Sequence, residues 1–169
     1  MKKQTIKIIS CLTFFTTSFY AQAQYVWTQM AGFPGAARSN ASCFSIGHYG
    51  YVGCGQGSSF YSDWWRWDQN TNSWTQIASY PGAGQNGCTY FVIAGKAYVG
   101  LGTNGSVQTD LWSYDTATNS WSQMASFPGA ARYGAYSFVI GSNAYMCGGN
   151  PGGPPYYTDC WKYNSVNNT

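Results

Sequence analysis

Short apolar and aromatic stretches alternate with glycine-, asparagine- and serine-rich turns along most of the chain. Because aromatic and β-branched residues favour strands and small polar residues favour turns, this pattern predicts β-strands joined by short loops. Four kinds of stretch recur in a fixed order: an apolar one, one that ends in glycines, one that opens with aspartate, and one that opens with tryptophan. The expected strands are 43–46, 51–55, 63–68, 74–77, 89–93, 98–102, 110–115, 121–124, 136–140, 145–149 and 159–164, preceded by a lone tryptophan-containing strand at 25–30.

The same order of residues returns three times. The segment from Trp27 to Arg38 recurs from Trp74 to Gln85 and again from Trp121 to Arg132, with a spacing of 47 residues each time. Four short strands in a unit of this length predict one blade of a β-propeller. We therefore expect repeats near 27–73, 74–120 and 121–169, within one repeat-containing segment at 24–169.

The repeated residues resemble kelch repeats. The likeness rests on Gly148-Gly149 at the end of the second strand, on the aromatic-x-Tyr-Asp pattern of the third strand, and on Asn-x-Trp at the start of the fourth. It covers about residues 25 to 169. It implies an all-β fold: a kelch-type β-propeller segment of about three four-stranded blades, with the first strand of each blade innermost. The chain departs from the pattern at Cys54, Leu101 and Asn164, and at Gln85, which stands where the other repeats have arginine.

The blade count is incomplete. The last repeat lacks its fourth strand, and the lone strand at 25–30 would complete that blade in a closed ring. Propellers have about four to eight blades, so a ring of three is not expected. One interpretation is that the chain is the first part of a longer protein whose missing C-terminal blades close the propeller. The other is self-association, in which two chains close a six-blade ring.

The first residues have the layout of a secretory signal peptide. Lys2, Lys3 and Lys7 precede a short apolar stretch at 8–20, and Ala21-Gln22-Ala23 is a small-x-small cleavage site. We expect residues 1–23 to be a signal peptide, and the mature chain to be secreted to an extracellular or periplasmic location. The apolar stretch is too short to cross a bilayer as a helix, so no membrane span is expected.

Charge and cysteine content narrow the possible partners. The formal net charge of +3 comes from three lysines of the leader, so the remainder is balanced and offers no electrostatic footprint for nucleic acid. The mature part has five cysteines and no CxxC pair, which argues against a zinc site. Buried thiols are the expected role for most of them, and a disulfide between Cys147 and Cys160 on adjacent strands is possible.

Little of the chain suits catalysis. There is no glutamate, and the five aspartates all occupy repeated positions at the start or end of the third strand of a blade, where framework roles at turns are expected. His48 is the only histidine, which excludes a three-histidine metal site within this chain. No cofactor, no metal and no catalytic residue is therefore expected. The kelch family that the chain resembles also includes enzymes, such as galactose-oxidase-like copper oxidases and sialic-acid epimerases. An alternative is thus that the chain is the N-terminal part of such a carbohydrate-active enzyme, with its active site beyond residue 169.

The remaining candidates are aromatic residues that do not recur in every blade. In kelch-like propellers the loops after the second and fourth strands share one face, and aromatic rings beside arginine and amide groups suit sugars or protein partners. The alternative is that these rings only pack their own loops. We expect a non-catalytic binding module for an unidentified protein or glycan partner. Its candidate contact residues are Arg38, Phe60, Tyr61, Trp64, Asn104, Arg132, Tyr156 and Tyr157.

Overall fold

The computed structural model describes residues 26–169, which form eleven β-strands and no helix. The expected all-β fold is confirmed. The predicted signal peptide at 1–23 lies outside the described residues. The strands are β1 (Ser42–Ile46), β2 (Tyr49–Gly53), β3 (Trp64–Asp68), β4 (Ser73–Ile77), β5 (Thr89–Ile93), β6 (Lys96–Gly100), β7 (Leu111–Asp115), β8 (Ser120–Gln123), β9 (Tyr136–Ile140), β10 (Asn143–Cys147) and β11 (Cys160–Asn164). Over residues 26–169, no helix is long and apolar enough to cross a membrane.

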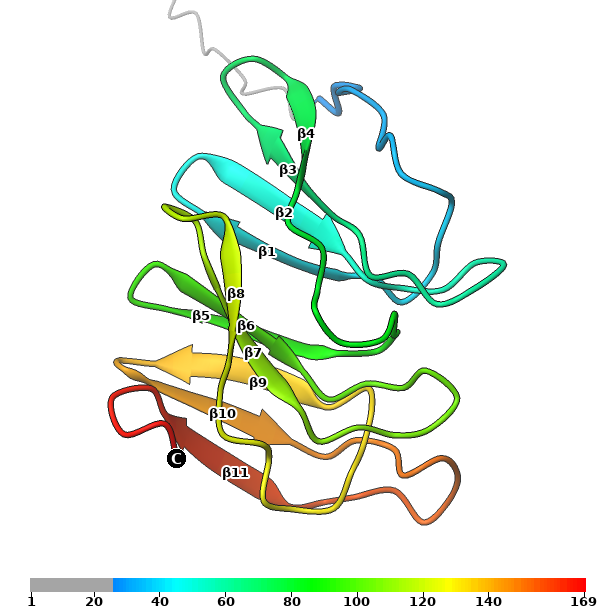
Figure 1. The fold of residues 1–169 in the computed structure, drawn as a ribbon, viewed down its shortest axis with the longest axis vertical. Coiled ribbons are helices and arrows are strands. Elements are labelled where there is room, and N and C mark those ends of the chain that lie inside the picture. The colour runs from blue at the N-terminus through cyan, green and yellow to red at the C-terminus, as the bar shows by residue number, and fades with distance from the viewer. Residues whose placement is uncertain (1–25) are drawn as a thin grey trace, which may run out of the picture.

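The strands form three antiparallel sheets, each a simple up-and-down meander. Their orders are β1-β2-β3-β4, β5-β6-β7-β8 and β9-β10-β11. Neighbouring sheets stack face to face along an open arc (Figure 1), with β5 lying beside both β1 and β9. The first strand of each sheet is thus innermost, as in consecutive blades of a propeller-like arrangement. We call the three sheets blades 1, 2 and 3.

Aromatic pairs fill the space between blades. In blade 1, Phe44 and Tyr51 stack with ring centroids 4.8 Å apart, and Tyr114 of blade 2 lies 6.0 Å from Tyr51. The same arrangement joins blade 2 to blade 3, where Tyr163 lies 5.6 Å from the stacked rings of both Phe91 and Tyr98. One tyrosine per junction therefore covers the aromatic pair of the preceding blade.

The outer strands add a second joint, made by a tryptophan. The Trp121 indole on β8 donates a hydrogen bond of 2.9 Å to the carbonyl of Ala78 in the loop that follows β4. Trp74 on β4 donates equivalently to Ala31, at 3.0 Å. Asparagine side chains strengthen these joints: the Asn119 carbonyl oxygen accepts hydrogen bonds from the Ala78 amide at 3.0 Å and from a tyrosine hydroxyl at 2.8 Å.

The second strand of each blade ends earlier than the sequence pattern predicts. The expected strands 51–55, 98–102 and 145–149 are replaced by strands that begin and end two residues before them. The first residues beyond these strands, Cys54, Leu101 and Gly148, have positive φ angles of 54°, 58° and 69°. A left-handed residue cannot continue an extended strand. The glycine-containing ends therefore turn out of the sheet into the next loop.

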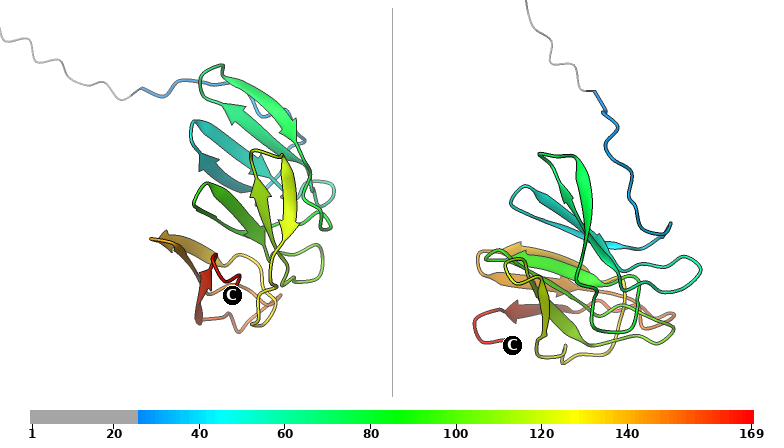
Figure 2. Two further views of the ribbon diagram at one scale, coloured as in Figure 1. Left: turned by 60° about the vertical axis from the view of Figure 1, so that its left-hand side comes forward. Right: turned by 45° about the horizontal axis from the view of Figure 1, so that its top comes forward.

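The prediction of a lone strand at 25–30 is wrong for residues 26–30, which the structure describes. Residues 26–30 pair with no strand, and Trp27 is completely exposed (101%). The reason is spatial. Blade 3 is the blade without a fourth strand, and its outer strand, β11, lies at the far end of the arc from these residues (Figure 2).

Candidate functional site: the loop face

The long loops lie along one side of the arc, on the right in Figure 1, while the tight turns lie on the other. Isolated β-bridges join each loop that follows a second strand to the loop that precedes its blade: Ser39 to Gln56, Asn86 to Thr103 and Tyr133 to Asn150. The loops are also joined from blade to blade, because the Gly87 amide donates to the Asn40 carbonyl and the Gly134 amide to Gly87. We call this side the loop face.

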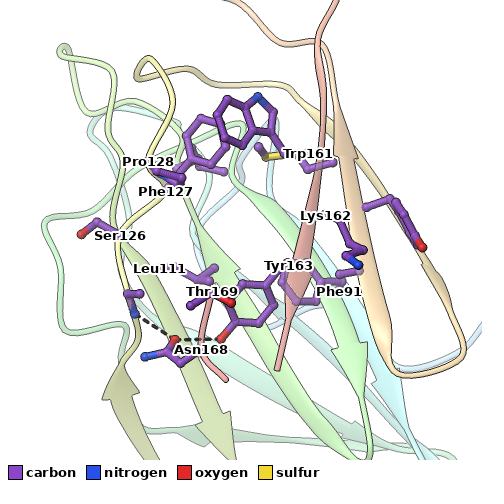
Figure 3. A pocket seen from close by; sticks show the side chains of 15 residues that line it. Phe91, Leu111, Ser126, Phe127, Pro128, Trp161, Lys162, Tyr163, Asn168 and Thr169 are labelled. Carbon is purple, nitrogen blue, oxygen red and sulfur yellow. Dashed lines mark hydrogen bonds between the residues drawn. The ribbon is translucent and has the colours of Figure 1, made fainter. Parts of the chain in front are cut away.

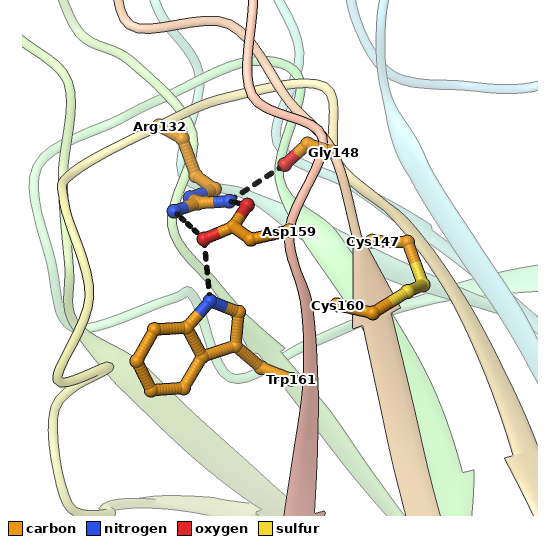
Figure 4. Close-up of a disulfide and its surroundings, with 6 residues drawn as sticks. All are labelled: Arg132, Cys147, Gly148, Asp159, Cys160 and Trp161. Atoms are coloured by element: carbon orange, nitrogen blue, oxygen red, sulfur yellow. Dashed lines mark hydrogen bonds and ion pairs between the residues drawn. A yellow bond between two sulfur atoms is a disulfide. The ribbon is translucent and has the colours of Figure 1, made fainter.

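Arg132 fixes the loop face at blade 3 (Figure 4). Its guanidinium binds both carboxylate oxygens of Asp159, at 2.5 and 2.9 Å, and donates a further bond to the Gly148 carbonyl. The Trp161 indole donates to the same carboxylate at 2.6 Å. The hydrogen bonds from Arg132 and Trp161 lower the pKa of Asp159 to about 2. Arg132 is only 1% exposed and all of this bonding is internal, so its charge is not available to a ligand.

Arg38 repeats this arrangement in blade 1. It binds both oxygens of Asp63, at 2.7 and 2.8 Å, and the Cys54 carbonyl at 3.0 Å. Burial alone would raise the pKa of Asp63, but hydrogen bonds from Arg38 and Trp65 outweigh it, and the pKa lies below its ordinary value. The two arginines that were expected among the contact residues therefore hold the scaffold together.

Two of the candidate tyrosines belong to these arginine clusters. The Tyr61 ring lies 4.5 Å from the Arg38 guanidinium, and the Tyr157 ring lies 4.1 Å from that of Arg132. Each tyrosine precedes the arginine-bound aspartate by two residues, so the pair does recur in the two blades that have arginine. The sequence interpretation treated both rings as unique because blade 2 lacks them. The correlated presence of arginine and tyrosine was the signal that could have revealed the pairing.

In blade 2 the aspartate at this repeat position is bound without an arginine. Gln85 replaces the arginine and Gln108 replaces the tyrosine. Asp110 instead accepts a hydrogen bond of 2.6 Å from the Tyr80 hydroxyl, where blades 1 and 3 have phenylalanine, and one of 3.0 Å from the Trp112 indole. Burial, followed by this bond to Asp110, raises the pKa of Tyr80. Three linked substitutions therefore distinguish the two ways of closing a blade.

Three further candidates lie in different surroundings. Trp64 was expected on the binding surface, but it is fully buried (0% exposed), with its ring 5.2 Å from Phe44 and 5.5 Å from Trp121. Its position at the start of β3 turns it toward blade 2. Phe60 is half-buried in the loop that follows β2. The Asn104 side chain accepts bonds from the amides of its own loop.

Tyr156 is the candidate that is free to contact a ligand. It is 63% exposed, in the proline-rich loop between β10 and β11. The disulfide between Cys147 and Cys160, which the sequence left as one possibility, is present and joins opposed residues of these two strands, so it closes the loop at its base (Figure 4). The adjacent Arg132–Asp159 pair and a bond from the Gly152 amide to Asn150 fix the loop further. An exposed aromatic ring is thus displayed on a loop fastened at its base.

The other chemical groups lie apart from this loop. His48 is in the turn between β1 and β2, on the opposite side from the loop face, with Nε2 4.0 Å from Asp68. Asp68 and Asp115 accept backbone amides of the turns that follow them. In residues 26–169, no three histidine, cysteine, aspartate or glutamate side chains come together as metal ligands. A hydrogen bond with the Cys88 thiol and, to a smaller extent, burial raise the pKa of the Cys54 thiol well above its ordinary value.

The fold is similar to that of a solved protein, YjhT, with a TM-score of 0.73 and 23% sequence identity. The match covers 82% of this chain and 52% of YjhT, so this chain spans about half the length of that structure. At this identity the comparison shows the fold alone, an arc of propeller-like blades. No protein-family model matches the chain, and no curated protein sequence matches it.

Proposed function

We propose that the chain is a secreted, kelch-type binding module that recognises a glycan through its loop face. The observation that carries the proposal is Tyr156, an exposed aromatic ring on a loop that is fastened by the Cys147–Cys160 disulfide and the Arg132–Asp159 pair. A ring held in place loses little conformational entropy when a sugar stacks on it. The disulfide suits the oxidising compartment that a signal peptide implies.

Binding without covalent chemistry fits the placement of the acidic groups. The described aspartates bind arginine, tyrosine and tryptophan side chains or turn amides, and His48 lies away from the loops. A general acid and base would need carboxyl groups that can reach a substrate. The alternative, that the chain is part of a carbohydrate-active enzyme, predicts that such groups reside in sequence beyond Thr169.

The test is a binding measurement on the full chain with a panel of immobilised neutral oligosaccharides. Tyr156→Ala is expected to weaken binding about tenfold, the value of one lost stacking contact. Val166→Ala is the control, because Val166 is also a well-exposed hydrophobic side chain (82%) but lies in the turn after β11, away from the loop face. Equal loss in both variants, or no loss in Tyr156→Ala, would refute the proposal. Binding of a protein but of no oligosaccharide would redirect it to a protein partner.

A further inference from the structure

A cavity at the open end of the arc is not explained by the loop face. It has a volume of about 280 Å³ and lies between blades 2 and 3 (Figure 3). Leu111, Phe127, Trp161 and Tyr163 line it, together with Ala125. Along one side runs β11, which pairs with β10 and has no neighbour on its other edge.

The preceding blades show what such a cavity holds. At the equivalent position between blades 1 and 2, the Trp121 ring of β8 lies 5.5 Å from both Trp64 and Tyr80 and 5.0 Å from Tyr114. In blade 1, Trp74 packs edge-on against Phe33 at 5.3 Å. In both blades a fourth strand inserts its tryptophan into this space.

Every group that holds Trp121 has a counterpart around the cavity of blade 3. Leu111, Phe127 and Tyr163 occupy the repeat positions of Trp64, Tyr80 and Tyr114. Ala125 occupies the position of Ala78, whose carbonyl accepts the indole hydrogen bond.

The asparagine joint is also complete in blade 3. The Asn168 oxygen accepts bonds of 2.9 Å from the Ala125 amide and 2.9 Å from the Tyr163 hydroxyl (Figure 3). Asn168 therefore makes the same two hydrogen bonds beside this cavity that Asn119 makes beside the site filled by Trp121.

The chain contains an unpaired segment whose sequence matches that of the fourth strands. The run Trp27-Thr-Gln-Met30 repeats Trp74-Thr-Gln-Ile77 and Trp121-Ser-Gln-Met124. Trp27 is fully exposed, and Val26 and Met30 are 71% and 44% exposed. This segment cannot reach β11 of its own chain, because the two lie at opposite ends of the arc (Figure 2).

The faces of the two end blades complement each other as well. In blade 3, Phe138 stacks on Tyr145 at 5.5 Å, as the aromatic pairs of blades 1 and 2 do, but no tyrosine of a following blade covers it, and Phe138 is 49% exposed. Trp67 in blade 1 occupies the repeat position of Tyr114 and Tyr163, the residues that cover the other pairs. Blade 1 of one copy thus presents an aromatic ring that suits the open face of blade 3 in another.

We propose that two copies of this chain assemble by strand exchange, in which residues 26–30 of each copy pair with β11 of the other and place Trp27 in the cavity. By analogy with the register of β4 on β3 and β8 on β7, Trp27 lies opposite Tyr163 and Gln29 opposite Trp161. A two-fold axis makes both junctions identical. The matched part of this chain corresponds to 52% of the YjhT chain, so two copies together have about the length of that protein.

The test is sedimentation velocity on the full chain over a wide concentration range, with three variants. The wild type and Thr28→Ala are expected to be dimers, because the residue after the tryptophan faces solvent in β4 and β8. Trp27→Ala is expected to weaken the dimer roughly 1,000-fold, since each of two junctions loses a buried anchor and one such loss costs about 30-fold. Trp27→Phe, which keeps a ring but not the indole donor, should fall between them.

A second measurement tests whether residues 26–30 bind in the cavity beside β11. A synthetic peptide of residues 24–34 should bind the Trp27→Ala chain, whereas the same peptide with alanine at position 27 should not. A wild-type chain that remains monomeric, or a Trp27→Ala chain that remains dimeric, would overturn the proposal. If the chain is monomeric but binds the peptide, the cavity accepts a strand from another source, such as residues beyond position 169, and exchange between copies is refuted. The outcome does not depend on glycan binding.

Discussion

Replacing Arg132 by glutamine tests whether the arginine clusters hold the blades closed. Glutamine is the natural residue at this repeat position in blade 2, so the substitution asks whether blade 3 tolerates it without the other changes that accompany Gln85. Arg132 is 1% exposed, binds Asp159 with two hydrogen bonds, and lies 4.8 Å from the Phe127 ring and 4.1 Å from the Tyr157 ring.

The expected loss of stability follows from these contacts. Each hydrogen bond to the carbonyls of Ala130 and Gly148 contributes about 1 kcal/mol, and each aromatic contact of the guanidinium about 0.5–1 kcal/mol. The ion pair adds only about 1 kcal/mol, because the Asp159 side chain is 41% exposed and water can solvate it after the substitution. Glutamine recovers about one hydrogen bond, so Arg132→Gln should lower the free energy of unfolding by about 3 kcal/mol, or roughly 10 °C in Tm.

Adding Phe127→Tyr should restore part of this loss. In blade 2 the Tyr80 hydroxyl binds Asp110 at 2.6 Å, and Phe127 occupies the same repeat position. In the Arg132→Gln background the new hydroxyl should regain about 1 kcal/mol through Asp159. In the wild type it meets the guanidinium and gains nothing, so the double-mutant cycle should show a coupling of about 1 kcal/mol.

The assay is chemical denaturation of the four proteins under non-reducing conditions, followed by tryptophan fluorescence. A cost below about 1 kcal/mol for Arg132→Gln would show that the cluster does not stabilise the blade. Additive effects of the two substitutions would refute the inference that blades 1 and 3 and blade 2 are alternative solutions to one packing problem.

Three further predictions concern single groups. Tyr61→Ala should lower the free energy of unfolding by about 1 kcal/mol, because its ring covers a guanidinium, while Tyr156→Ala should change it by less than about 0.5 kcal/mol; equal effects in thermal melts would contradict the assignment of the two rings. The guanidinium bonded to Asp159 lowers the pKa of that carboxyl to about 2, so the ionised form favours the folded state; this contribution is complete above a pH of about 4 and is lost as the pH falls through about 2. Asp159→Asn should therefore flatten the dependence of Tm on pH in this window, and an unchanged slope would count against the pair. Reduction of the Cys147–Cys160 bond, which spans 13 residues, should cost about 2–3 kcal/mol in urea denaturation, whereas no change in midpoint would mean that the bond does not constrain the unfolded chain.

Much of the architecture could be predicted because the residues that recur in the sequence pack in the same way in every blade. Trp74 and Trp121 mark the start of the outer strands, and the strand that follows each opening aspartate lies where its alternation places it. The ends of the second strands could not be predicted, because Cys54 and Leu101 have ordinary strand-like side chains and only their positive φ angles take them out of the sheet. Local pattern does not reveal a backbone conformation that neighbouring loops impose.

The candidate site was predictable only in part, for a different physical reason. The sequence shows that Arg38 and Arg132 recur. It does not show that each guanidinium group is paired with an aspartate, 25 and 27 residues away respectively. Trp64 looked unusual because blade 2 has leucine there, and the structure shows that the extra volume fills the core. Tyr156 could be distinguished from Tyr157 only by its exposure, which depends on the direction in which each ring leaves the loop.

The free edge of β11 has a consequence for handling and engineering the protein. A contact between unlike ends of a molecule closes into a small ring only if the rotations between successive units add up correctly; otherwise it continues into a helical filament. The aromatic pairs and their covering tyrosines, such as Tyr98 and Tyr163, fill the space between adjacent blades. Substitutions that resize these rings are therefore expected to change the curvature of the arc and to convert the proposed two-copy ring into fibres.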